Sequence, residues 1–176
     1  MAMNSVIQNA SLIKKVYIPK YIFPISRVFS SFVTMSFSLV AILIVMLATG
    51  TPFHFSILLF WILILFLLFF SCGIGMILAA LAVQFRDIMH LYSVITMAWM
   101  YLTPIFYPID AVPAEVGRVI MFNPLYKYIN IFRSLVLYGT IPEPGLWVSG
   151  ALTAIVYLAL GVLIFRKAQR NFILYI

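Results

Sequence analysis

The chain has 176 residues, of which 65% are hydrophobic and 9% are charged, whereas soluble domains carry roughly 25% charged residues. A soluble core of this size cannot enclose so much apolar surface, which excludes a soluble globular fold and indicates lipid as the solvent. The net charge of +7 is scattered between apolar blocks and forms no basic stripe, which argues against a nucleic-acid partner and favours anionic membrane lipids.

Residues 4–26 form a basic segment interrupted by prolines. Asn4 or Ser5 can cap a helix at its start, and we expect Pro19 and Pro24 to break that helix before the first membrane span. Apolar residues recur along it at the spacing of one helix face: Val6, Ala10, Ile13 and Tyr17. Such a helix either lies in the membrane interface and holds the first span in register, or it is a docking surface for a partner.

Four apolar blocks follow, and a helix needs about 20 such residues to cross a bilayer core of about 30 Å. Long apolar runs without strict alternation favour helices over barrel strands. We expect Gly50 to close the first span and Pro104 to kink or end the third. The predicted spans are residues 28–49, 55–83, 91–107 and 146–165.

The basic residues indicate how these spans are oriented. If the N-terminus is cytoplasmic, eight basic residues lie inside: Lys14, Lys15, Lys20, Arg27, Arg86, Arg166, Lys167 and Arg170. Three lie outside: Arg118, Lys127 and Arg133. This bias predicts that both termini, including a tail at 166–176, are cytoplasmic.

Residues 110–139 do not read as a simple span. Pro113 and Asn123-Pro124 are typical of helix starts and Gly139 of a helix end, so we expect two short helices. Each of their charges would cost roughly 2.5–3.5 kcal/mol at the bilayer centre. A re-entrant pair that dips into the outer leaflet avoids that cost, and an amphipathic pair lying flat on the outer surface is the alternative.

Two patterns accompany the second span. Small residues repeat every four positions, at Ser71, Gly75 and Ala79, and permit close approach of a neighbouring helix, for which ordinary packing is the favoured explanation. Arg86 and Asp87 follow the span and either anchor its end to headgroups or contact a cytosolic partner.

Aromatic residues gather around the third span: Tyr92, Trp99, Tyr101 and Tyr107. Aromatic faces stack on sugar rings, so these side chains are candidates for lining a pathway, although anchoring at the interface is the commoner role of such residues.

The sequence contains no group suited to catalysis. It lacks a G-x-x-x-x-G-K-[ST] phosphate loop, its four acids are dispersed, Cys72 is alone, and His54 and His90 are far apart. We therefore expect no enzyme activity, no metal site and no bound cofactor in this chain.

Four motifs occur in order along the chain: SLIKKVYIPKYIFP from Ser11, FRDI from Phe85, TPIFYP from Thr103 and NPL from Asn123. Together they resemble the permease subunit of type 2 ABC exporters of polysaccharides and polyol phosphates, a group that includes O-antigen, capsule and teichoic acid exporters. The resemblance implies an all-α polytopic protein of the bacterial cytoplasmic membrane. It also implies a homodimeric channel for a lipid-linked glycan, with ATP and Mg bound by separate nucleotide-binding subunits.

The resemblance also implies roles for individual residues. Ser11, Leu12, Ile13, Lys14 and Lys15 match a coupling helix that docks on the ATPase subunit, and Arg86 and Asp87 match the second cytoplasmic loop. Asn123 and Pro124 match outer re-entrant helices that gate the channel. Members of the family carry two more spans ahead of the coupling helix, so we expect two N-terminal spans to be missing here.

Other classes of function stay open on the sequence. A type 2 exporter of drugs or other lipids would share this architecture. A passive channel, a structural membrane subunit or a non-functional fragment would need no ATPase partner, whereas a membrane enzyme would need a cluster of acids, histidines or nucleophiles that is not apparent.

Overall fold

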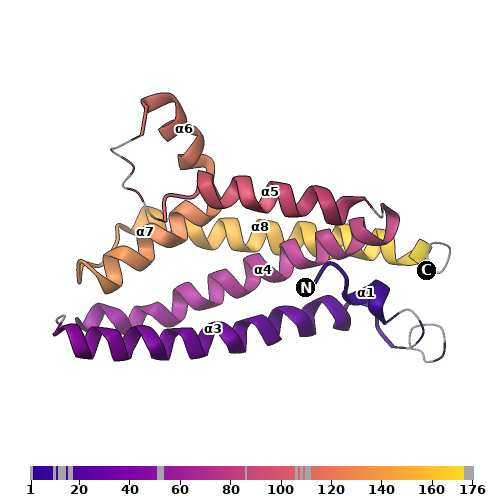
Figure 1. Cartoon of the computed structure of the whole chain (residues 1–176), viewed down its shortest axis with the longest axis horizontal. Helices are drawn as coiled ribbons and strands as arrows, with labels where there is room; N and C mark the ends of the chain where they lie inside the picture. The colour runs from indigo at the N-terminus through magenta and orange to yellow at the C-terminus, as the bar shows by residue number, and fades with distance from the viewer. Residues whose placement is uncertain are drawn as a thin grey trace. The chain divides into compact units, whose positions relative to one another are not determined.

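The computed structural model describes residues 2–9, 11, 15, 18–50, 54–85, 87–105, 107, 109 and 112–172. Within these ranges all regular structure is helical, which confirms the predicted all-α class. The chain divides into two compact units. The first comprises Met1–Pro52, Leu68–Ile88 and Ala154–Ile176, and the second comprises Phe53–Leu67 and Met89–Thr153. Helices α4 (Phe60–Gln84) and α8 (Pro144–Ala168) have residues in both units (Figure 1).

The first long helix, α3, spans Ile22–Thr49 in the first unit. Gly50 ends it in the left-handed conformation with a φ of 68°, which confirms the predicted stop. The expectation that Pro24 breaks a helix ahead of the span is wrong, because Pro24 lies in the first turn of α3 itself. The N–H groups of a first turn have no intrahelical partner, so a proline there removes no hydrogen bond.

Most hydroxyl side chains of α3 bond to the backbone of the helix itself. Several donate to the carbonyl four residues earlier, namely Ser31, Thr34, Ser36, Ser38 and Thr49. Pro24 and Met46 are the buried residues of this helix, and most of its remaining surface is exposed. An exposed helix whose hydroxyls bond to its own backbone is suited to hydrocarbon surroundings.

Three helical stretches in the described ranges are long and apolar enough to cross a membrane: Ile22–Thr49, Phe55–Gln84 and Pro144–Ala168. The second consists of the short helix η1 (Phe55–Leu59) continued by α4. The predicted third span corresponds to α5 (Ile88–Leu102), which ends just before Thr103-Pro104. Its 15 residues measure about 22 Å, which is less than a bilayer core of about 30 Å.

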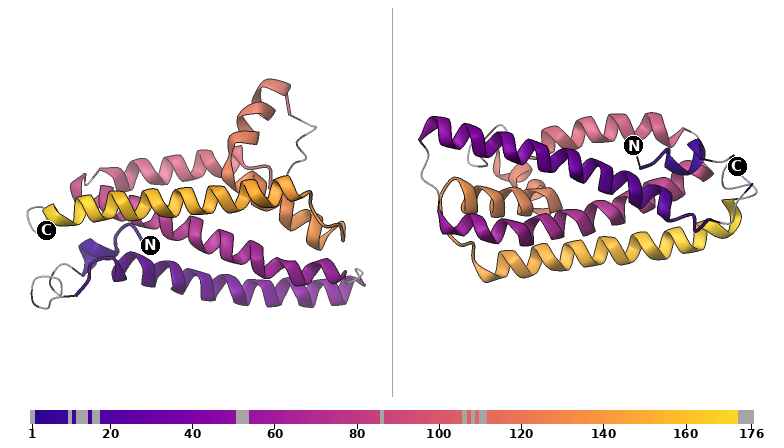
Figure 2. Two further views of the ribbon diagram at one scale, coloured as in Figure 1. Left: turned by 180° about the vertical axis from the view of Figure 1, so that it is seen from behind. Right: turned by 90° about the horizontal axis from the view of Figure 1, so that it is seen from below.

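The opening segment differs from the helix expected there. Helix α1 covers only Ser5–Gln8, and Asn4 at its N-cap makes no capping bond with its side chain. The Asn9 side chain donates to the Ser5 carbonyl at 2.7 Å, and such side-chain bonds compete with continued helix. The rest of the predicted helix face, Ala10, Ile13 and Tyr17, lies outside the described residues. Figure 2 shows α1 beside the first turns of α3.

Two glycines let α4 and α8 touch backbone to backbone within the first unit. A Cβ atom on Gly73 of α4 would collide with the carbonyl of Tyr157, and one on Gly161 of α8 would collide with the backbone of Gly73. In lipid, such close packing takes the place of the hydrophobic effect as the force between helices. Near this crossing the rings of Phe70 and Tyr157 meet edge to face, with centroids 4.9 Å apart.

The buried core of the first unit brings together α1, α4 and the end of α8. Its members are Val6, Met76, Ala79, Ala80, Val83, Phe165, Ala168 and Phe172. Lys20, just before α3, donates to the Gln169 carbonyl at 3.0 Å, and its ammonium lies 5.7 Å from the centroid of the Phe172 ring. This side chain therefore ties the start of α3 to the chain that follows α8.

The second unit is built around α7 (Pro124–Val136). Its buried face is Pro124, Tyr128, Ile131 and Leu135. Ser56 of η1 donates to the Leu135 carbonyl at 2.9 Å, and the Tyr128 hydroxyl donates to the Gly150 carbonyl of α8 at 3.1 Å. These bonds hold η1 and the first turns of α8 against α7.

Helix α6 (Ala114–Phe122) precedes α7, and the two helices diverge at Asn123 (Figure 1). The predicted helix starts after Pro113 and at Asn123-Pro124 are confirmed. Gly139 has a φ of 62° three residues beyond the end of α7, in agreement with the predicted stop.

Gly73→Ala is expected to lower the stability of the protein by about 1–3 kcal/mol, because the added methyl group must push two helix backbones apart. Gly117→Ala is the matched control: no atom lies within 4 Å of the position its Cβ would take, and alanine favours a helix over glycine. The thermal unfolding midpoint of each variant in detergent measures the difference. Equal midpoints would contradict the glycine crossing.

Candidate functional site

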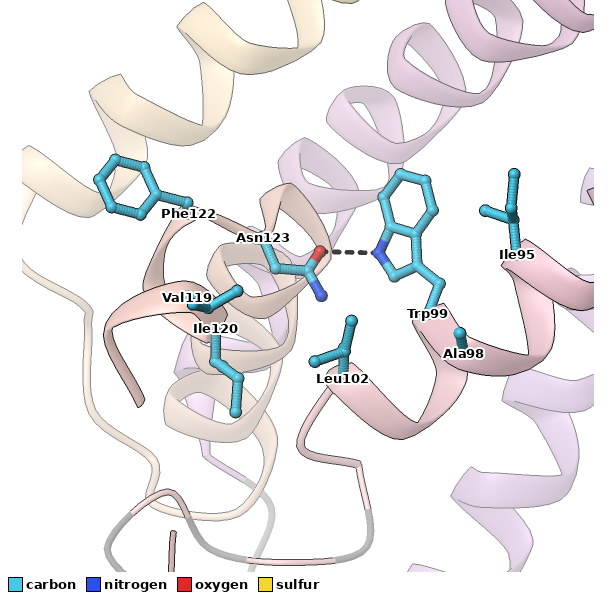
Figure 3. A pocket seen from close by; sticks show the side chains of 8 residues that line it. All are labelled: Ile95, Ala98, Trp99, Leu102, Val119, Ile120, Phe122 and Asn123. Atoms are coloured by element: carbon cyan, nitrogen blue, oxygen red, sulfur yellow. Dashed lines mark hydrogen bonds between the residues drawn. The ribbon is translucent and has the colours of Figure 1, made fainter. Parts of the chain in front are cut away.

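A cluster of polar side chains in the second unit centres on Asn123, between α6 and α7. Its Oδ1 accepts hydrogen bonds from Trp99 Nε1 and from the backbone N–H of Leu125, both at 3.0 Å. Its Nδ2 donates to Thr103 Oγ1 at 2.9 Å. Figure 3 shows the indole of Trp99 and the amide of Asn123 directed at each other. Asn123 is therefore both the N-cap of α7 and the link to the end of α5.

Further hydrogen bonds hold the chain that follows α5. The hydroxyl of Thr103, which is only 2% exposed, donates to the Trp99 carbonyl at 2.7 Å. The guanidinium of Arg133, in the last turn of α7, donates to the carbonyls of Pro104 and Ile105 at 2.8 and 3.1 Å. Arg133 therefore holds the segment that follows α5 against the last turn of α7.

An apolar groove of about 360 Å³ opens beside Asn123 (Figure 3). Its walls come from α5, from α6 and from the turn between α6 and α7, through Ile95, Ala98, Trp99, Leu102, Val119, Ile120, Phe122 and Asn123. Trp99 and Asn123 contribute polar atoms that bond to each other. The groove is consequently suited to an acyl chain or another apolar group, and it offers a sugar few hydrogen bonds.

The other aromatic candidates do not share one face. Tyr92 and Trp99 are seven residues apart on α5, which places them on the same side of that helix. Tyr101, on another side, is 66% exposed, and its carbonyl accepts a hydrogen bond from the Tyr107 hydroxyl at 2.7 Å. The structure therefore brings Trp99, Asn123 and Pro124 together but leaves Tyr101 and Tyr107 as a separate pair.

The candidate partner-contact residues lie in the first unit. Ser11, Lys15 and Asp87 are exposed, as contact with a partner requires. The remaining members of this set, Leu12, Ile13, Lys14 and Arg86, lie outside the described residues.

The three small residues predicted to form a packing stripe on α4 differ in their exposure. Gly75 and Ala79 are buried, whereas Ser71 is exposed. A Cβ on Gly75 would stand 3.1 Å from Val28 Cγ2 of α3, so this glycine permits close packing of α4 on α3.

The comparison with known protein families decides where this chain belongs. The family model described as ABC-2 type transporter matches residues 1–137, which include every helix from α1 to α7. The chain belongs to the ABC-2 type transporter family. The match also includes the cluster around Asn123 and the segment that precedes α3.

Curated relatives of this ABC-2 type transporter chain carry the names of export and transport proteins. It is 26% identical over 171 residues to "O-antigen export system permease protein RfbA" of Myxococcus xanthus, covering 96% of this chain and 66% of that protein. It is 29% identical over 174 residues to the Klebsiella pneumoniae protein of the same name, covering 96% and 65%. "Polysialic acid transport protein KpsM" of Escherichia coli is 24% identical over 139 residues, covering 77% and 54%. The chain thus spans just under two thirds of the length of the O-antigen relatives.

Sequence reasoning about this ABC-2 type transporter chain missed Thr103, Arg133 and Gly161. The sequence identifies Arg133 only as one of the outer charges. Its position in the last turn of a helix is the signal that it could bind free carbonyl groups. Thr103 precedes a proline, which marks a helix end, but no local pattern connects its hydroxyl to Asn123. Gly161 stands alone in an apolar run, and only the fold pairs it with Gly73.

Asn123→Ala is expected to destabilise the protein by about 1–3 kcal/mol, because it removes the cap of α7 and leaves Trp99 Nε1 and Thr103 without their partner. Asn130→Ala is the matched control on the same helix, since no hydrogen bond of its side chain is found within the described ranges. We expect its effect to stay within about 0.5 kcal/mol. Thermal unfolding of both variants in detergent tests this, and a smaller loss for Asn123→Ala than for Asn130→Ala would refute the assignment.

Proposed function

We propose that this chain is the membrane permease part of an ATP-driven exporter that moves a lipid-linked polysaccharide or polyol phosphate polymer across the bacterial cytoplasmic membrane. A separate ABC ATPase subunit binds ATP and Mg and hydrolyses the nucleotide, and a second permease copy completes the channel. Both termini face the cytoplasm, and the helix pair at 110–139 dips into the outer leaflet.

The similarity to polysaccharide exporters carries this proposal. Family membership supports a transport subunit, and the printed names of the relatives, which concern O-antigen and polysialic acid, favour a glycan over a drug. Three helices with the length and apolarity of membrane spans support placement in a bilayer.

The first unit suggests how a partner moves the permease. Exposed basic residues gather before α3 and in the last turn of α8, among them Lys15, Arg166 and Lys167. They suit an acidic or headgroup-facing surface on the cytoplasmic side. Lys20 joins the segment before α3 to the chain after α8, so a push on that segment is passed to two spans at once.

The second unit suggests a gate. Asn123 and Arg133 fasten the end of α5 to both ends of α7, whereas much of α6 is exposed, including Val119, Met121 and Phe122. In this proposal α5 and α7 move together as a rigid pair, and α6 moves relative to them as the gate. Trp99 and Tyr92 then offer one aromatic face to passing sugars.

Neutralising Lys14, Lys15 and Arg86 together is expected to weaken association with the ATPase subunit about three- to a hundredfold, since each exposed charge pair contributes about 0.2–1 kcal/mol. Membrane insertion should be unchanged. The measurement is ATPase stimulation and polymer export in vesicles that hold the permease and its ATPase. Arg118→Gln, which removes an exposed charge on α6, is the control. Wild-type ATPase stimulation and export by the triple variant would contradict the proposed contact between these residues and the ATPase subunit.

A further inference from the structure

Lys127 is a cation whose charge has no acidic partner among the described residues. It lies on α7, half-buried, and its ammonium donates to Thr153 Oγ1 of α8 at 3.4 Å. The acids of the second unit that the structure describes, Glu115 and Glu143, are exposed and form no ion pair with it. The Thr153 hydroxyl that accepts from Lys127 itself donates to the Ser149 carbonyl at 2.7 Å, so its lone pairs face the ammonium.

Two other polar side chains of this unit bind within the protein. Arg133 donates from one guanidinium nitrogen to the carbonyls of Pro104 and Ile105, and Asn123 makes three hydrogen bonds. Arg118 lies exposed on α6. Lys127, by contrast, is half-buried and makes one hydrogen bond, so its ammonium retains N–H donors for a ligand.

Asn130 adds a second set of unused donors. It follows Lys127 by three residues on α7, so the two side chains are neighbours on one face of the helix. Its amide makes no hydrogen bond within the described ranges. It is also not among the buried side-chain polar atoms without a hydrogen bond, of which the described part of the chain has one, Asn4 Oδ1. An approaching group can therefore reach it.

We propose that Lys127 and Asn130 form a binding site for an oxyanion, a phosphate or carboxylate, with Thr153 positioning the ammonium. An ammonium in a membrane protein is costly unless an anion or water compensates it, and such residues mark ligand paths by default. The ammonium supplies charge-assisted hydrogen bonds and the amide a neutral one. The anion belongs either to a lipid headgroup or to the transported polymer. The site rests on the proposed function for its place at the outer side of a membrane.

The test measures binding and does not involve export. The chain is purified in a neutral detergent, and its thermal midpoint is followed against inorganic phosphate, with chloride keeping the ionic strength constant. In parallel, native mass spectrometry counts phosphatidylglycerol and phosphatidylcholine retained from nanodiscs that contain both lipids. Phosphate probes an anion delivered from water, and phosphatidylglycerol probes one delivered from the bilayer.

Lys127→Gln is expected to weaken binding of the preferred probe about tenfold, which corresponds to about 1.4 kcal/mol of binding free energy. Lys127→Arg should retain most of the binding, and Arg118→Gln should retain all of it. Asn130→Ala is expected to weaken binding of the probe by less. Because it removes no contact of the fold, it provides a second test if Lys127→Gln fails to fold. If Lys127→Gln loses binding of phosphatidylglycerol alone, the anion comes from a lipid headgroup. If it loses binding of phosphate alone, the anion belongs to the transported polymer.

Wild-type binding of both probes by Lys127→Gln, or an equal loss in Arg118→Gln, would overturn the site. Because export is not measured, the two proposals fail separately. A protein that binds the anion through Lys127 but exports no glycan retains the site and loses the proposed function.

Discussion

Hydrocarbon offers no hydrogen-bond partners, and this constraint organises the whole molecule. The hydroxyls of α3 donate to carbonyls of their own helix. The carbonyls released where α5 ends are bound by Arg133, and Asn123 satisfies the start of α7 together with Trp99. In such surroundings an ammonium without an acidic partner marks a place where an anion is expected to bind. Lys127 makes one hydrogen bond, to Thr153, whereas Arg133 binds two carbonyls of the chain.

The two units meet this constraint with different chemistry. In the first unit, Gly73 and Gly161 bring helix backbones into contact, so dispersion between close surfaces holds α4 to α8. In the second unit, side-chain hydrogen bonds join the ends of the short helices α5 and α7. Glycine contacts adapt poorly to change, whereas a hydrogen bond such as Trp99 to Asn123 can break and re-form.

Local features of the sequence predicted local features of the structure. The stop at Gly50 and the cap at Asn123 depend on neighbours within a few residues, and both appear as expected. Pro24 was misread because a proline in a first turn looks, in sequence, like one that separates two elements. The side-chain partners of Asn123 and the backbone that Gly73 contacts lie 20 residues or more along the chain, so these pairings depend on the fold and no spacing rule reveals them.

The most direct test of the proposed export function is the fate of the glycan when this chain is depleted from its bacterium. A permease for lipid-linked polymer predicts that surface polysaccharide falls while the lipid-linked polymer accumulates inside the cell, and that expression of the chain reverses both changes. Unchanged surface polysaccharide with no accumulation would contradict it.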